Sequence, residues 1–200
     1  MKRPIFEKGS IDERIQIIGE TGARPRLLLH ACCGPCASSV LERLVPYFDI
    51  TVYYYNPNIM PKEEFIRRLE ALKMVILHFE GVKLIVPAQS EDEYIPLVKG
   101  LENEREGGAR CGICFALRLE GTAKYLAGHK DEYDFFATTL TVSPHKDNVR
   151  INKIGNSIAE KYGVEYLSSN FKKQDGYLRS TQLSKEFNIY RQDYCGCKFE

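Results

Sequence analysis

Short apolar runs alternate along this chain with longer segments in which apolar residues recur every three or four positions. The short runs have the length and the β-branched and aromatic content of strands, whereas the longer segments have the period of amphipathic helices. Five runs are predicted as strands: 26–31, 49–56, 82–88, 133–140 and 164–169. Because strands and helices alternate, the pattern predicts an α/β fold, a single domain with a Rossmann-like, mostly parallel sheet of about five strands flanked by helices.

Two of the intervening segments show the helical period most clearly. Apolar side chains recur at helical spacing after the first strand and again within KEEFIRRLEALKMVILHF, where Pro61 stands just ahead as a helix starter. These apolar positions are Val40, Leu41, Leu44, Val45, Phe65, Leu69, Leu72 and Ile76. Gly163 follows NKIGNSIAEKY as a C-cap. We place residues 1–24 as an N-terminal helical extension of one domain, 1–200.

Composition and charge limit the classes of function. The 200 residues, 44% of them hydrophobic, suffice for one packed core. Lys and Arg number 28 against 27 Asp and Glu, so the net charge of +1 lacks the basic excess of a non-specific nucleic-acid binder. A polyanionic partner would therefore have to meet a local basic patch. No apolar run is long enough to span a bilayer, and we expect a cytoplasmic protein without a membrane partner.

Cysteine is the residue type that most changes this picture. The seven cysteines fall into three groups, CCGPC (Cys32, Cys33, Cys36), RCGIC (Cys111, Cys114) and YCGC (Cys195, Cys197). In a reducing compartment stable disulfides are rare, and an odd number leaves one thiol unpaired in any case. The groups therefore favour metal or redox chemistry.

Several uses of these thiols stay open. A lone buried cysteine is more often a small core residue, but three groups at ligand-like spacing weaken that interpretation. CGPC has the spacing of a thioredoxin-like redox motif, which leaves five cysteines without a role. CGPC and CGIC together match a four-cysteine zinc site, which leaves Cys32, Cys195 and Cys197 over. Iron–sulfur ligation draws on distant parts of a chain, and seven thiols could hold one four-iron cluster and a second metal.

The order of the strands predicts where these groups lie. In an open parallel sheet the functional crevice is outside the carboxyl ends of the strands. The segments 32–36, 56–61 and 139–148 each follow a predicted strand, so we place them on one rim. We expect the three cysteine groups to converge there.

Basic side chains gather in two segments near this rim. SPHKDN, 143–148, leads into a helix whose amino terminus attracts anions, and Lys146 and Arg150 add positive charge. The segment 168–197 interleaves basic and aromatic residues, as suits an unstacked RNA base and its phosphates. These residues are Lys172, Lys173, Arg179 and Arg191 with Phe171, Tyr177 and Tyr190. A capped helix start is the alternative for the first segment, and a solvated amphipathic helix explains the second about equally well.

Five motifs, in order, carry a resemblance that covers nearly the whole chain, from about residue 25 to residue 200. LLHACCGPC, YYYNPNIMPKEEFIRR, RCGICFALRLEGTAKYLA, FFATTLTVSPHKD and YRQDYCGC resemble the cobalamin-independent epoxyqueuosine reductases, the QueH family. The resemblance implies a tRNA-modifying oxidoreductase that converts epoxyqueuosine to queuosine at the wobble position. It also implies a variant of the adenine-nucleotide alpha-hydrolase (HUP) fold, with CCGPC in place of the phosphate-binding loop.

The same resemblance implies cofactors and roles. The family is associated with a four-iron four-sulfur cluster (4Fe-4S) and a neighbouring single iron. We expect cluster ligands among Cys32, Cys33, Cys36, Cys111 and Cys114, with Cys195 and Cys197 at the single iron. Candidate proton donors or further ligands are His30, His145, Asp193 and Tyr194. The expected tRNA-binding residues are Lys146, Arg150, Lys172, Lys173 and Arg179, and the expected partners are tRNA with queuosine-type anticodons and an electron donor.

Two other functions remain as alternatives. A cluster-dependent tRNA thiolase on the same fold would need ATP, yet cysteines occupy the place of an SGG-x-DS-like loop after the first strand. A zinc-stabilised RNA-binding module without catalysis would need only the metal and the basic patch. The colour of the anaerobically purified protein separates them, because a cluster protein is brown and a zinc protein is colourless.

Overall fold

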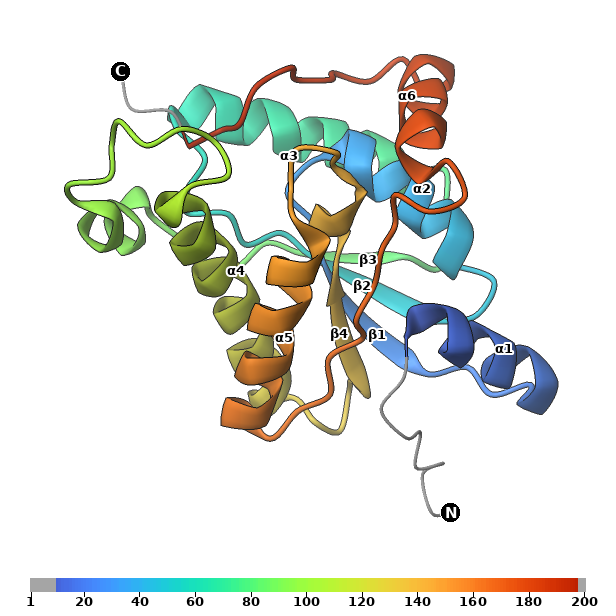
Figure 1. Ribbon diagram of the computed structural model, residues 1–200. Coiled ribbons are helices and arrows are strands. Elements are labelled where there is room, and N and C mark those ends of the chain that lie inside the picture. Colours follow the sequence, from blue (N-terminus) through green and yellow to red (C-terminus); the bar gives the residue numbers. More distant parts are fainter. Residues whose placement is uncertain (1–9, 198–200) are drawn as a thin grey trace.

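The computed structural model describes residues 10–197, and a parallel sheet forms its centre (Figure 1). The strands are β1 (Arg26–His30), β2 (Asp49–Tyr53), β3 (Lys83–Ile85) and β4 (Phe135–Thr138). They lie in the order β3-β2-β1-β4, and every pair is parallel. This is the strand order of the Rossmann-type sheet, in which the direction of winding reverses beside β1. The prediction of a single α/β domain is confirmed.

The expected number of five strands is wrong. The segment 164–169 joins the sheet through one parallel bridge, between Phe136 in β4 and Tyr166. Two residues later the chain turns away, and the carbonyl of Ser168 accepts a hydrogen bond of 3.0 Å from the backbone N–H of Ile11. The apolar run therefore covers the edge of β4 and anchors the first helix instead of continuing the ladder.

Helices cover both faces of the sheet. They are α1 (Ile11–Thr21), α2 (Gly34–Leu44), α3 (Lys62–Ile76), α4 (Ala109–Gly128), α5 (Asn148–Tyr162) and α6 (Gly176–Glu186), with short 3-10 turns at Glu91–Glu93, Ile95–Val98 and Thr139–Val142. Figure 1 shows α4 and α5 together on one face, and α2, α3 and α6 on the other. Within residues 10–197, no helix combines the length and apolar character needed to cross a bilayer.

The two faces of β1 supply the centres of two apolar clusters. Leu27 and Leu29 pack with α2 and α3, whereas Leu28 packs with α4 and α5, as the period-2 alternation of a strand requires. Ile11 and Ile18 of α1 belong to the first cluster, so the helix in the expected N-terminal extension is part of the main core. Residues 1–9 of that extension lie outside the described residues.

The glycine of CCGPC is required by a close approach between helices. A Cβ atom on Gly34 would lie 2.7 Å from the carbonyl oxygen of Ala71 in α3, a distance that rigid backbone cannot accept. The missing side chain therefore lets the amino end of α2, which carries Cys33 and Cys36, rest against the backbone of α3.

We expect Gly34→Ala to lower the free energy of unfolding by about 1 to 3 kcal/mol, because overpacking at this contact forces α2 and α3 apart. The matched control is Gly19→Ala in α1, where nothing lies within 4 Å of the new Cβ and the helix gains up to about 1 kcal/mol. Urea denaturation of both variants measures the difference. Equal stabilities would contradict the close approach.

Candidate functional site

A cavity of about 220 Å³ opens at the carboxyl edge of the sheet. All three predicted rim segments line it, through residues such as Cys32 after β1, Asn58 after β2 and Lys146 after β4. The segment between Arg191 and Gly196 forms a further wall. The structure therefore brings together parts of the chain that the strand ends place on one rim.

The first group of thiols lies at the start of α2. The Sγ atoms of Cys32 and Cys33 are 3.8 Å apart, and hydrogen bonds from Cys32 and Cys36 lower the pKa of Cys33 well below its ordinary value. Hydrogen bonds with Cys32 and Cys33 raise the pKa of Cys36. Cys33 is also the N-cap of α2, where the helix dipole favours an anion. Cys33 is therefore the most acidic thiol of this group.

The second group joins α4 to the C-terminal segment. The Sγ atoms of Cys195 and Cys197 are 3.4 Å apart, and the hydrogen bond from Cys197 lowers the pKa of Cys114. The bond to Cys114 raises the pKa of Cys197, and the bond to Cys197 raises that of Cys195 well above its ordinary value. The C-x-C pair thus contacts a cysteine of the C-x-x-C pair, and Cys114 is the most acidic thiol of the second group.

The two cysteines of α4 face different neighbours. Cys111 packs in the same cluster as Cys32 and Cys33, and its Sγ accepts a hydrogen bond of 3.2 Å from the N–H of Gly107. Cys114 packs with Cys195 and Cys197. Packing therefore divides the thiols into four, Cys32, Cys33, Cys36 and Cys111, and three, Cys114, Cys195 and Cys197.

The donor set fits thiolate-bound metal. All seven cysteines are free thiols. Two thiolates on one tetrahedral metal, with bonds of about 2.3 Å, lie about 3.8 Å apart, close to the 3.4 Å between the Sγ atoms of Cys195 and Cys197. Between residues 10 and 197, no three His, Cys, Asp or Glu side chains already form a complete site for one ion, so the fit rests on the chemistry and pairing of the donors.

Three cations surround the thiols. Arg68 and Arg118 are 4% and 3% exposed, and the side chain of Lys146 is 16% exposed. Burial disfavours the charge of Arg118, but the thiols of Cys114 and Cys32 outweigh it and raise the pKa of the guanidinium. Burial also lowers the pKa of Lys146, but the nearby thiols of Cys195 and Cys32 outweigh burial and raise it. The positive potential of the cavity favours anionic sulfur.

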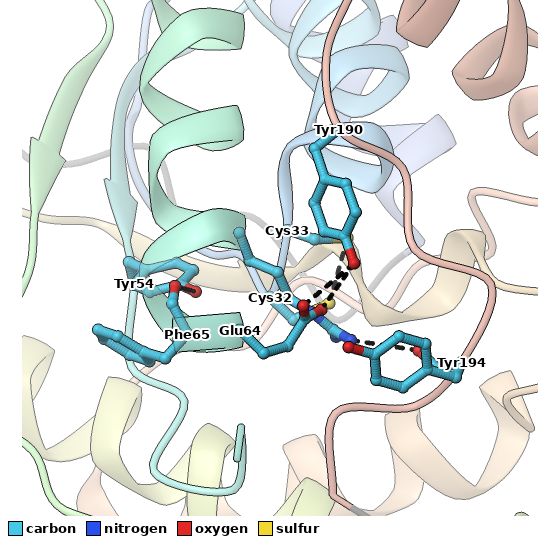
Figure 2. A network of polar contacts seen from close by, with 8 residues as sticks. Cys32, Cys33, Tyr54, Glu64, Phe65, Tyr190 and Tyr194 are labelled. Atoms are coloured by element: carbon cyan, nitrogen blue, oxygen red, sulfur yellow. Dashed lines mark hydrogen bonds and ion pairs between the residues drawn. The ribbon is translucent and has the colours of Figure 1, made fainter. Parts of the chain in front are cut away.

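A polar network fastens the C-terminal wall to α3 (Figure 2). Arg68 donates from Nε to Glu64 over 2.6 Å and from Nη2 to the carbonyl of Tyr194 over 3.2 Å. The hydroxyl of Tyr190 donates to Glu64 over 3.0 Å. The N–H of Met60 donates to the carbonyl of Gly196 over 2.8 Å. Cys195 and Cys197 are therefore held in place from α3 and the loop before it.

The predicted proton donors separate into two kinds. His145, Asp193 and Tyr194 line the cavity, and partial burial and the hydrogen bond to Glu64 raise the pKa of Tyr194 to about 12. His30 is fully buried between Thr138 and the carbonyl of Tyr55, at 2.9 and 3.1 Å. Burial and the charge of Arg118 lower the pKa of His30 to about 4. His30 is therefore a neutral, hydrogen-bonded residue that connects β1 to β4 and to the segment after β2.

The predicted tRNA-binding residues have different surroundings. Lys146 lies in the cavity, and Arg150 donates to two backbone carbonyls of the loop before α4, over 3.1 and 2.9 Å. Arg179 forms ion pairs with two carboxylates, over 2.6 and 2.9 Å. Lys172 donates to the carbonyl of Lys146 and is half-buried, and Lys173 is exposed. Of the five, Lys173 alone is exposed, and Lys172 stands next to it in the chain.

The lining residues missed from the sequence include four polar ones, Asn58, Arg68, Arg118 and Gln192. Arg118 had a usable signal, because it stands four residues after Cys114 and seven after Cys111 and so shares their helix face. Arg68 had a weaker one, the i, i+4 pair with Glu64 on the buried side of α3. No local pattern marks the two amides.

Comparison with known proteins gives a consistent result. The family model described as "Epoxyqueuosine reductase QueH" matches residues 27–200. A protein of that name from Streptococcus pyogenes is 42% identical over 181 residues, 88% of this chain and 70% of the relative. The Thermotoga maritima protein of that name is 38% identical over 86% of this chain and 88% of its own. Among solved structures, a predicted subunit of tRNA methyltransferase from Methanocaldococcus jannaschii aligns with a TM-score of 0.49 and 15% identity, over 80% of this chain and 76% of that one.

Proposed function

Since the chain belongs to the QueH family of epoxyqueuosine reductases, we propose that its cysteine-lined cavity is where the epoxide oxygen of epoxyqueuosine in tRNA is removed. Both C–O bonds of the epoxide break, a carbon–carbon double bond forms, and the oxygen takes up two electrons and two protons and leaves as water. The observation that carries the proposal is the gathering of the thiols around a cavity at the carboxyl edge of the sheet. This is the edge at which such sheets bind ligands.

We propose that the thiols hold a 4Fe-4S cluster and a second iron. The group of four, Cys32, Cys33, Cys36 and Cys111, suits the cluster, and the group of three, Cys114, Cys195 and Cys197, suits the single iron. This division moves Cys114 away from the cluster expected from the sequence, because it packs with the C-terminal pair. When bound, the cluster would supply electrons at low potential, and the single iron would supply Lewis acidity toward oxygen.

Protein side chains supply the remaining requirements. The charges of Arg118 and Lys146 stabilise thiolates and favour negative charge on an oxygen that leaves carbon. Tyr194, with a pKa of about 12, keeps its proton at neutral pH and can give it up from the wall of the cavity. His145 and Asp193 line the same wall and are the other proposed proton sources.

The function is tested on anaerobically purified protein with a strong one-electron reductant and tRNA that carries epoxyqueuosine. We expect queuosine to form, and we expect iron and sulfide analysis with a Mössbauer spectrum to show a cluster and a further iron. A colourless zinc protein that binds tRNA without turnover would favour the non-catalytic module. Transfer of sulfur to tRNA would favour a thiolase.

We propose that Lys172 and Lys173 form part of the tRNA path. A cation that no longer reaches its phosphate lowers the slope of log affinity against log salt by about one unit, so Lys172→Ala with Lys173→Ala should weaken binding and reduce this slope by about two. The matched control is the pair Lys73→Ala and Lys83→Ala, which removes the same charge from two exposed lysines near the opposite edge of the sheet. Filter binding at several salt concentrations compares them. Equal slopes would make the basic segment only a solvated face.

A further inference from the structure

Two buried amide oxygens in the cavity have no role in the chemistry described so far. Within the described residues, Oδ1 of Asn58 and Oε1 of Gln192 are buried atoms without a hydrogen-bond partner, and both residues line the cavity. Asn58 is only 2% exposed. A buried acceptor left unpaired costs about 1 to 3 kcal/mol, and the large majority of such atoms in proteins are paired. Two in one cavity indicate a ligand that supplies the donors.

The fold fixes where these acceptors lie. Asn58 stands in a tight loop closed by the bond from the N–H of Ile59 to the carbonyl of Asn56, over 3.1 Å. The side chain of Asn56 donates to the carbonyl of Ala31 over 2.9 Å, which ties the loop to the end of β1. The side chain of Gln192 hydrogen-bonds the sulfur of Cys33 and helps to lower the pKa of that thiol. Because only the amide nitrogen can donate to sulfur, the oxygen is left as a free acceptor.

Three other polar side chains of the cavity are of the opposite kind. Arg68, Arg118 and Lys146 are donors and carry positive charge. An epoxide oxygen can only accept hydrogen bonds, so the cations suit it and the two amide oxygens do not. Hydroxyl groups can donate, and the ring that bears the epoxide in epoxyqueuosine also carries a diol. The cavity thus offers cations to the epoxide oxygen and amide oxygens to the hydroxyl groups of the same ring.

We propose that Asn58 and Gln192 form a subsite that accepts hydrogen bonds from the hydroxyl groups of the epoxide-bearing ring. This proposal rests on the proposed function. The two amides orient the ring so that its epoxide oxygen faces the cations and the thiols. They are specificity-determining residues that contact the substrate, and they hold the ring before and after the oxygen has left.

The test uses Asn58→Leu, which keeps the number and branching of the side-chain atoms and removes the acceptor, with Asn58→Asp as the variant that retains an acceptor. Affinities are measured for tRNA with queuosine, which keeps the diol, and for the same tRNA with guanine at the wobble position. We expect wild-type protein to prefer the queuosine form, Asn58→Leu to lose about 5- to 50-fold of that preference, and Asn58→Asp to keep more of it. Iron content and unfolding by urea are measured on the same samples.

The stability of Asn58→Leu without tRNA separates a substrate contact of Asn58 from a structural role, because the two roles predict opposite changes. Without tRNA, Asn58→Leu should be as stable as wild type or more stable, because an unpaired buried acceptor has been removed. Loss of stability, loss of iron, or an unchanged preference in Asn58→Leu would each overturn the subsite. If wild-type protein neither reduces epoxyqueuosine nor prefers the modified tRNA, the proposed function fails first, and the subsite fails with it.

Discussion

Replacing Cys33 by alanine should remove most of the bound iron and abolish turnover, whereas Cys197→Ala should abolish turnover and leave most of the cluster in place. Cys33 belongs to the group of four, and hydrogen bonds from Cys32 and Cys36 at the start of α2 lower its pKa. Cys197 belongs to the group of three, which contacts Cys114 and the C-terminal segment. Each change therefore acts on a different metal in the proposed arrangement.

Iron and sulfide per chain, the visible spectrum, tRNA affinity and single-turnover formation of queuosine are measured together under anaerobic conditions. Cys197→Ala should bind tRNA as wild type does, because the change removes a sulfur and no basic side chain. Ser39→Ala, on the same helix as Cys36 but without a thiol, controls for packing and should keep both metal and turnover. Full turnover by Cys197→Ala would end its catalytic role. Loss of metal and solubility together in every cysteine variant would assign the thiols to the fold alone.

Glu64→Ala should lower the free energy of unfolding by about 3 to 5 kcal/mol, because it leaves the Arg68 guanidinium buried without its carboxylate. Both side chains of this pair are 5% exposed, so water cannot replace the missing carboxylate. The same change removes the acceptor for Tyr190 and frees Arg68, which holds the carbonyl of Tyr194. A shift of about 1 Å in the wall that carries Cys195 can lower kcat on the order of 100-fold.

Two milder variants separate stability from positioning. Tyr190→Phe removes one hydrogen bond to Glu64 and should cost about 1 kcal/mol. Glu64→Gln keeps the shape of the side chain and an acceptor for Arg68, so its loss of stability should lie between those of Tyr190→Phe and Glu64→Ala. Urea denaturation gives the stabilities, and kcat measured well below the unfolding transition gives the rates. If Glu64→Ala matched Tyr190→Phe in both, the network would not position the C-terminal wall.

The strand ends could be read from the sequence because local rules set them. The apolar runs in RLLLH and near 50 and 135 predict strands, and the parallel order brings their carboxyl ends together. The run at 164–169 follows the same rule and still forms only a bridge, because the carbonyl of Ser168 pairs with α1. That competing partner is remote in the chain and leaves no local signal.

Local rules could not predict how the thiols are grouped or which partners the basic side chains contact. Cys114 stands beside Cys111 in the sequence but packs with Cys195 and Cys197, since successive turns of α4 face different neighbours. Arg150 has the sequence context of an anion-binding residue, yet its guanidinium is taken up by carbonyls of the loop before α4. Both outcomes depend on contacts between distant segments. The catalytic, metal-binding and tRNA-binding roles stay predictions.

The cations beside the thiols link the lifetime of this protein to the supply of iron. Arg68 is paired with Glu64, but metal-free thiols are less negative beside Arg118 and Lys146 than the fully anionic thiolates that bind iron. Because metal binds the folded chain and not the unfolded one, its binding free energy adds to stability. Under iron starvation we therefore expect cells to lose the polypeptide to proteolysis rather than store it as an inactive pool, so that its abundance follows iron status.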